Sequence, residues 1–139
     1  MLKSTTEIRV RYSETDQIGR VYYANFLVYF EVARTQLIRN HWKPYSELEK
    51  DGYLLPVMNA GCKYFLPVGY DDLVRIETCL TLPRPSLLRF DYTIDNPRCL
   101  TLVAEGFTEH CFVGRDGKLR RVPRELVRLI KESTGEPNQ

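Results

Sequence analysis

Residues 24 to 40, with the sequence ANFLVYFEVARTQLIRN, form the segment that most limits how this chain can fold. The spacing of its apolar residues predicts a helix of roughly 25 Å, at about 1.5 Å per residue. Its first half is apolar almost all round, and its few charges are Glu31, Arg34 and Arg39. Because a helix that is hydrophobic on so many sides is normally covered by other structure, we expect it at the centre of the domain.

Extended segments with strand-like patterns account for most of the remaining chain. In residues 6 to 12, apolar and charged side chains alternate, which is the period of a strand with one buried face. The expected strands are residues 6–12, 54–66, 74–82, 88–94 and 100–113, and residues 123–132 are expected to form a short terminal helix.

No internal repeat or linker divides the chain, so we expect residues 1–139 to form a single domain. The order of elements is a strand, a long buried helix and then further strands joined by turns. This order favours the α+β class, with a curved antiparallel sheet of about five strands wrapped around the helix.

Composition limits the classes of function. The chain is 43% apolar and 27% charged, as in ordinary soluble globular proteins. Its net charge of +2 provides no global field that would recruit nucleic acid or an anionic membrane. The N-terminal segment MLKSTTEIRV lacks the apolar core of a signal peptide, and no run of about eighteen apolar residues occurs. We therefore expect a cytoplasmic protein without nucleic-acid partners or a membrane segment.

The metal-ligating residue types are scattered. His41 and His110 are interpreted as structural residues, and the cysteines form neither a CxxC pair nor a Cys/His cluster with the spacing of a zinc site. We therefore expect no metal site and no cofactor. The cysteines, interpreted as reduced and mostly buried thiols, are Cys62, Cys79, Cys99 and Cys111.

Residues 12 to 26, YSETDQIGRVYYANF, combine acids with aromatic rings between the first strand and the helix, which suggests a site. A solvated loop would not need three tyrosines, and a core strand would not place two acids beside them. Structural interpretations also exist for the acids: Asp16 can cap a turn or the helix, and Glu14 can form an ion pair at the end of the strand.

The other polar residues of this segment have supporting interpretations. Tyr12, Tyr22 and Tyr23 are expected to line a pocket rather than to donate protons, because a phenol titrates near a pKa of about 10. Asn25 is expected to shape the site by bonding the loop or capping the helix. Later in the chain, Asp71 and Asp72 follow a turn and are interpreted as turn residues.

The segment from Tyr12 to Phe26, followed by an apolar helix, resembles the hotdog-fold acyl-CoA thioesterases of the 4-hydroxybenzoyl-CoA thioesterase type. It closely resembles the bacterial branch whose members are found alongside the Tol-Pal envelope system. The similarity extends through YFLPVGYDDLVRIET at residues 64 to 78, so it covers most of the chain. In many relatives of that branch a histidine occupies the place of Tyr23, and here this chain departs from the pattern.

The resemblance implies a hotdog fold and an enzyme that hydrolyses acyl-CoA thioesters. It also implies that Asp16 is the catalytic carboxylate and that the backbone N–H of Tyr23 polarises the thioester carbonyl. This is chemically reasonable, because a helix N-terminus offers unpaired N–H groups to a developing oxyanion. Asp16 can act as a general base or as a nucleophile, and the sequence leaves both roles open.

Other acyl-transfer machinery is missing from the sequence. There is no Gly-x-Ser-x-Gly motif and no plausible Cys/His pair with a cysteine at a helix start. A dehydratase of the same fold would generally need a histidine near the central helix, and none lies between residues 12 and 40. The alternative function is a non-catalytic module that binds acyl-CoA or acyl carrier protein.

The expected partners are the acyl-CoA substrate, acyl carrier protein as a second carrier, and further copies of the chain. A small curled sheet leaves free edges and an apolar outer face, so a homodimer or homotetramer is expected. Pro56 to Asn59 of one chain should then approach the Asp16 region of the other. The basic cluster at residues 114–121 has two interpretations: it holds the CoA phosphates, or it is a solvated charge run. The candidate substrate-binding residues are Tyr12, Gly19, Tyr22, Asn25, Pro56, Asn59, Arg120 and Arg121.

Overall fold

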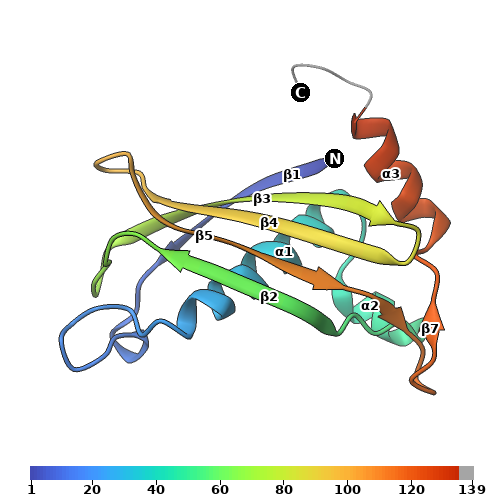
Figure 1. Cartoon of the computed structure of the whole chain (residues 1–139), viewed down its shortest axis with the longest axis horizontal. Helices are drawn as coiled ribbons and strands as arrows, with labels where there is room; N and C mark the ends of the chain where they lie inside the picture. Colours follow the sequence, from blue (N-terminus) through green and yellow to red (C-terminus); the bar gives the residue numbers. More distant parts are fainter. Residues whose placement is uncertain (135–139) are drawn as a thin grey trace.

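The computed structural model describes residues 1–134, in which one sheet curls along one side of a long helix (Figure 1). In chain order the elements are β1 (Leu2–Arg9), the 3-10 turn η1 (Tyr12–Glu14), α1 (Asn25–His41), α2 (Tyr45–Lys50), β2 (Val57–Tyr64), β3 (Leu73–Arg84), β4 (Leu87–Asn96), β5 (Thr101–His110), β6 (Phe112–Val113), β7 (Leu119–Arg120) and α3 (Arg124–Thr134). No helix of the described residues is long and apolar enough to cross a membrane.

The main sheet has five strands in the order β1-β3-β4-β5-β2, and all neighbouring strands are antiparallel. Strands β3, β4 and β5 follow one another as hairpins and form its middle, where alternate side chains such as Ile76 and Ile94 face the core. Strands β1 and β2 are the edges. This arrangement confirms the α+β class and the long helix that the apolar pattern predicted.

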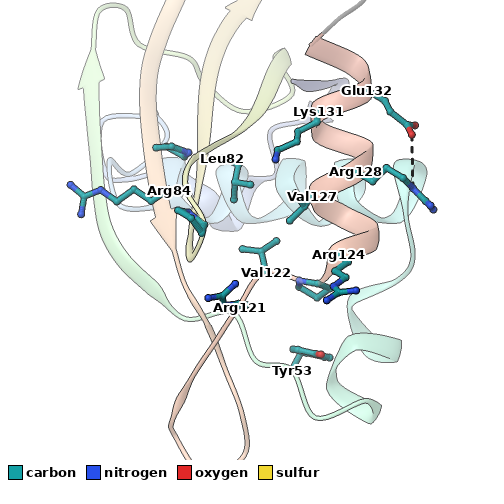
Figure 2. Close-up of a pocket in the computed structure, with 13 residues that line it drawn as sticks. Tyr53, Leu82, Arg84, Arg121, Val122, Arg124, Val127, Arg128, Lys131 and Glu132 are labelled. Carbon is teal, nitrogen blue, oxygen red and sulfur yellow. Dashed lines mark ion pairs between the residues drawn. The ribbon is translucent and has the colours of Figure 1, made fainter.

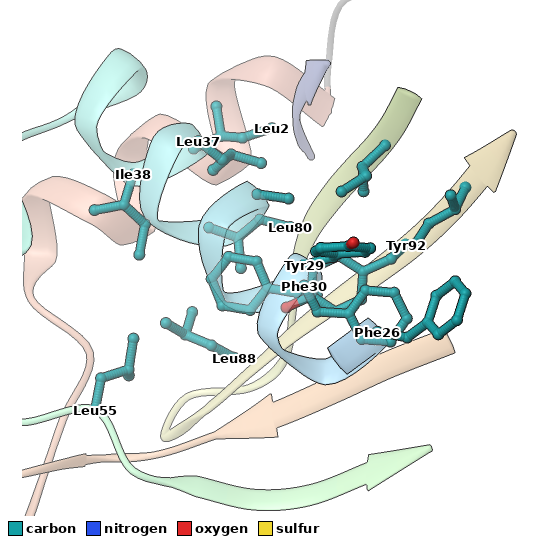
Figure 3. Close-up of a cluster of buried hydrophobic side chains, with 14 of the residues drawn as sticks. Leu2, Phe26, Tyr29, Phe30, Leu37, Ile38, Leu55, Leu80, Leu88 and Tyr92 are labelled. Carbon is teal, nitrogen blue, oxygen red and sulfur yellow. The ribbon is translucent and has the colours of Figure 1, made fainter. Parts of the chain in front are cut away.

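Helix α1 packs one apolar face against the inner side of the sheet (Figure 3). The ring of Phe30 stacks on that of Tyr92 of β4, with 4.2 Å between ring centroids and 6° between planes. Gly106 of β5 makes this packing possible, because a Cβ there would lie 2.7 Å from Phe30 Cε2. The buried residues of this helix face are Phe26, Tyr29, Phe30, Ala33, Leu37 and Ile38.

Helix α1 lies at the centre of the fold as expected, but the described residues leave its opposite side uncovered. Leu27, Val28 and Val32 keep 43%, 48% and 45% of their surface exposed. The physical reason is that one five-stranded sheet can cover only one face of a helix, so the remaining apolar positions are left at the surface.

Several boundaries differ from those expected. Strand β1 ends at Arg9 because its partner β3 begins opposite it, at Leu73. Tyr12 therefore lies in the turn η1 and not in a strand, and its side chain is 77% exposed. The expected strand at residues 100–113 is interrupted after His110, and the short helix α2 lies in the connection between α1 and β2.

A short chain of hydrogen bonds lies on the inner face of the sheet. The Tyr92 hydroxyl lies 2.6 Å from Thr108 Oγ1, which lies 2.8 Å from His110 Nε2. His110 Nδ1 lies 3.3 Å from the Leu55 carbonyl oxygen, which can only accept, so Nδ1 holds the proton. In neutral His110, Nε2 then accepts from Thr108, which leaves the Thr108 oxygen to accept from Tyr92.

This environment keeps His110 neutral. Burial lowers the pKa of His110 from 6.5 to about 4, and the charge of Arg34 acts in the same direction. Since the folded-state pKa is below the unfolded value, the unfolded chain binds a proton that the folded chain rejects as pH falls below about 6.5. We predict that His110 lowers the free energy of unfolding by about 2 kcal/mol between about pH 7 and pH 5.

Urea denaturation of the wild-type protein and of His110→Gln across this pH range would measure the effect. The variant should be less stable at neutral pH, where it loses hydrogen bonds, but its stability should fall less steeply on acidification. Parallel pH profiles for the two proteins would contradict the assignment of a buried neutral histidine.

Candidate active site

The segment between β1 and α1 is fastened to the helix through Glu14. Glu14 Oε1 accepts from the Arg11 backbone N–H at 2.8 Å and from the Tyr29 hydroxyl at 3.0 Å. The backbone carbonyl of Glu14 accepts from Tyr22 N–H at 2.9 Å and from Asn25 Nδ2 at 2.8 Å. Glu14 thus holds the loop through more contacts than the ion pair expected of it, and Asn25 bonds the same loop.

The Glu14 carboxylate lies in a sheltered position. Its side chain is 17% exposed, and its second oxygen lies 3.6 Å from Arg11 Nε. Burial raises the pKa of Tyr29 strongly, and the hydrogen bond to Glu14 adds to this effect, so the phenol stays protonated and keeps donating. This contact connects the site loop to the buried face of α1.

Asp16 lies at the tip of this loop, and one of its oxygens closes a tight turn. Oδ1 accepts from the backbone N–H groups of Ile18 at 3.0 Å and Arg20 at 3.1 Å. Gly19, whose φ of +80° suits glycine, completes the turn. Among residues 1–134 no donor reaches Oδ2, so half of the carboxylate caps the turn and half is available for chemistry.

The start of α1 supplies unpaired N–H groups beside this carboxylate. The N–H groups of Tyr23 and Ala24 have no acceptor in the described part of the chain, whereas Asn25 and Phe26 already donate to Tyr22 and Tyr23. The Tyr23 carbonyl also accepts from the Tyr64 hydroxyl at 3.2 Å. Free N–H groups at a helix N-terminus attract negative charge.

Asp16 and Tyr23 line the same hollow, of about 390 Å³, which we call the Asp16 hollow. Its walls come from the site loop, the first turn of α1 and the residues that follow β2. They are Asp16, Ile18, Arg20, Val21, Tyr22, Tyr23, Phe26, Tyr64, Phe65, Leu66, Pro67 and Val68. The arrangement places an acid, the residue Tyr23 with its free N–H group and an apolar wall around one space.

The wall after β2 was not singled out by the sequence analysis. Tyr64 packs edge-on against Phe26 and Tyr23, with centroids 5.3 and 6.3 Å apart. Burial raises the pKa of Tyr64 to about 12, so its hydroxyl is a donor and not a base. The signal in the sequence is the run YFLP, whose aromatic and apolar residues continue past the end of a strand.

Other expected site residues lie away from the Asp16 hollow. The Tyr12 ring packs against Tyr70 at the surface, 5.7 Å between centroids. Pro56 and Asn59 lie at the opposite end of β2 from Tyr64, and Asn59 Nδ2 donates to Glu109 at 3.1 Å. Arg120 and Arg121 lie beyond that end, beside α3 (Figure 1). A single chain therefore does not bring all the expected residues together.

The basic cluster at residues 114–121 is divided by its contacts. Arg115 donates to the Glu49 carbonyl at 2.8 Å, and Arg120 pairs with Asp116 at 3.2 Å. Arg121 instead lines a hollow of about 820 Å³ between α3 and the β3–β4 turn (Figure 2). We call this the α3 hollow; its floor includes Leu82, Val122 and Val127, and its cations are Arg84, Arg121, Arg124, Arg128 and Lys131.

Two further observations concern ions and charge. No group of three His, Cys, Asp or Glu residues that could hold a metal occurs within the described residues. The turn acids Asp71 and Asp72 are held locally, because Asp72 accepts from Gly69 N–H at 2.8 Å and Asp71 lies 3.9 Å from Arg9. Asp16 is therefore the acid that lines a hollow together with Tyr23, whose N–H is free.

Comparison with known proteins identifies the family. The family model described as thioesterase-like superfamily matches residues 10–130. YneP of Bacillus subtilis is 42% identical over 94 residues, covering 68% of this chain and 68% of that protein. The acyl-CoA thioester hydrolase YbgC of Escherichia coli O157:H7 is 29% identical over 125 residues, covering 90% of this chain and 93% of that protein.

A solved structure agrees in fold over nearly the whole length. The structure of the DHNA-CoA thioesterase from Staphylococcus aureus superimposes with a TM-score of 0.90 and 29% sequence identity, covering 97% of this chain and 93% of that one. These comparisons confirm the resemblance seen in the residues around Asp16. The chain therefore belongs to the thioesterase-like superfamily, and it is a thioester hydrolase with the hotdog fold.

Proposed function

We propose that this protein hydrolyses acyl-CoA thioesters in the Asp16 hollow, with Asp16 as the catalytic carboxylate and the Tyr23 N–H as the oxyanion donor. The observation that carries this proposal is that Asp16, which has one carboxylate oxygen without a donor, and Tyr23, whose N–H has no acceptor, line one hollow with apolar walls. Thioester hydrolysis needs both groups, one for the attack and one for the developing oxyanion.

In the general-base form of the mechanism, Asp16 Oδ2 takes a proton from water as the water attacks the thioester carbonyl. The carbonyl oxygen becomes an oxyanion next to the Tyr23 N–H, and collapse of the intermediate expels CoA thiolate. In the nucleophilic form, Oδ2 itself attacks the thioester carbonyl, the C–S bond breaks with release of CoA thiolate, and water then hydrolyses the mixed anhydride. Both forms use the same oxygen in the same position.

We predict that Asp16→Asn folds normally but loses about 10² to 10⁴ of the thioesterase rate. Asparagine keeps an oxygen that can accept from Ile18 and Arg20, so the turn should survive while the base is lost. Release of free thiol from a panel of acyl-CoA thioesters would measure the rate, and thermal melting would check the fold. Asp71→Asn, which changes an acid outside the hollow, is the matched control. Near wild-type hydrolysis by Asp16→Asn would refute the mechanism.

The proposed enzyme is a homodimer or homotetramer, in which two chains complete each site. Strand β2 is a free edge, and its residues Val57, Met58 and Tyr64, together with Phe65 just after it, are 47% to 63% exposed. Antiparallel pairing of two β2 edges would bring Pro56 to Asn59 of one chain to the Asp16 hollow of the other. Such pairing would also cover the apolar wall of that hollow.

Light scattering at micromolar concentration is therefore expected to give a dimer or a tetramer. Met58→Lys, which places a charge on the exposed part of the edge strand, should shift the mass toward that of one chain and lower the activity together with it. Lys63→Gln, which removes a charge from the same strand, should do neither. A monomeric wild-type protein with full activity would exclude the shared site.

We further propose that Arg120 and Arg121 hold the phosphates of CoA, with Arg121 acting from the α3 hollow. The support is electrostatic: the hollow gathers several cations over an apolar floor and includes Glu132 as its one lining acid. Such a cluster favours an anionic ligand with an apolar part, such as a nucleotide. In the proposed β2-paired dimer, the end of β2 near Arg120 and Arg121 would lie close to the Asp16 hollow of the other chain.

Replacing Arg120 and Arg121 with alanine is expected to raise KM for acyl-CoA by roughly threefold to thirtyfold and to leave kcat nearly unchanged, because these contacts are equal in the ground and transition states. The single Arg121→Ala should account for most of the effect, since Arg120 is paired with Asp116. A truncated thioester without the nucleotide is the control substrate. An equal loss on both substrates would assign the cluster to a structural role.

The same assay with acyl carrier protein thioesters would distinguish the two expected carriers. A cytoplasmic location is proposed because the free cysteines suit a reducing compartment.

A further inference from the structure

Arg34 of α1 is a half-buried cation that the proposed mechanism does not use. Burial lowers the pKa of His110, and the positive charge of Arg34 lowers it further. Burial raises the pKa of Tyr92, and Arg34 partly opposes that rise. The guanidinium therefore lies close to the polar chain on the inner face of the sheet. No carboxylate of residues 1–134 forms an ion pair with it.

A half-buried guanidinium without a counter-ion is unfavourable, because it has lost part of its hydration and gained no opposite charge. Tyr92 and neutral His110 offer it dipoles but no negative charge. Evolution of a stable core alone would favour an apolar residue at this position. The arrangement is instead suited to an anion that comes from outside the chain.

A hollow of about 120 Å³ gives such an anion access to Arg34. It is lined by Glu31, Arg34, Thr35, Ile38, Tyr45 and Leu55, and we call it the Arg34 hollow. Since one water occupies about 30 Å³ in the liquid, the space suits a small group such as a carboxylate with a few waters. Glu31 is exposed and hydrated, so its repulsion of an anion is weaker than the attraction of the more sheltered Arg34.

The Arg34 hollow is placed to receive the far end of an acyl group. Leu55 lines it and immediately precedes Pro56 to Asn59, the segment that would face the partner's Asp16 in the β2-paired dimer. An acyl group whose thioester is held at one chain's Asp16 would therefore point toward the Arg34 hollow of the other. This step depends on the function and the dimer proposed above.

We propose that Arg34 binds a carboxylate at the far end of the acyl group, so that the enzyme selects ω-carboxyacyl-CoA thioesters over apolar ones of similar length. Arg34 is then a specificity-determining residue that touches the substrate far from the scissile bond. A charge-assisted hydrogen bond in a sheltered position discriminates by about tenfold or more.

The test compares adipoyl-CoA with heptanoyl-CoA, which has a similar length and no terminal charge. The wild-type enzyme should show a higher kcat/KM for adipoyl-CoA. Arg34→Met, which keeps the length and removes the charge, should lower kcat/KM for adipoyl-CoA at least tenfold and leave heptanoyl-CoA within threefold. Arg34→Lys should retain part of the preference. Arg39→Met, on the exposed side of the same helix, should change neither substrate.

The outcomes separate this inference from the proposed function. Hydrolysis of heptanoyl-CoA without any preference for adipoyl-CoA would overturn the role of Arg34 and leave the thioesterase mechanism intact. An equal loss on both substrates in Arg34→Met would make Arg34 a structural residue and would also overturn the inference. Failure of the wild-type enzyme to hydrolyse any thioester of the panel would instead refute the proposed function.

Discussion

One turn of α1 joins the core of this protein to its candidate active site. Phe30 stacks on Tyr92 over the strand position that Gly106 keeps open, and this contact holds the helix against the sheet. The adjacent residue, Tyr29, donates to Glu14 and so holds the loop that presents Asp16. Because both contacts come from neighbouring residues of one rigid helix, the packing of the core also sets where the free N–H of Tyr23 lies relative to the carboxylate.

The surface of the chain shows where this fold is incomplete. The exposed apolar residues are concentrated along the edge strand β2, after its end, and at the start of α1, while the outer side of the middle strands has ion pairs such as Arg75 with Asp95 at 2.9 Å. Apolar surface next to a free sheet edge is typical of a protein interface. Some of these exposed residues, namely Tyr22, Tyr23, Tyr64, Phe65 and Leu66, line the Asp16 hollow, so in the proposed β2-paired dimer one contact would cover the edge and close the site. Such a dimer would also account for the division of the expected site residues between the two ends of β2.

Patterns in the sequence predicted the parts of this structure that depend on interactions between residues close together in the chain. The apolar run of α1 and the alternation in β3 and β4 are periodic, and the loop around Asp16 stands out because acids and rings occur together. The position of Tyr12 could not be predicted, because β1 ends where β3 begins and that pairing joins residues far apart in the sequence. The wall formed by Tyr64 to Leu66 and the environment of Arg34 also depend on contacts between residues far apart in the sequence. The uncovered side of α1 could not be predicted either. The apolar pattern predicts which helix positions are hydrophobic, but it does not indicate whether the same chain or another one covers them.

Glu14 and Asp16 illustrate how position divides two chemically similar acids into different roles. Both oxygens of Glu14 have partners, and its carbonyl has two more, so this acid is committed to holding the loop. Asp16 uses one oxygen to close its turn, its other oxygen has no donor among the described residues, and the residue lines an apolar hollow together with Tyr23. The bonded oxygen fixes the direction of the free one, which is the preorganisation that a general base or a nucleophile needs. The turn-capping interpretation and the catalytic interpretation of Asp16 are therefore compatible, because each concerns a different oxygen of the same carboxylate.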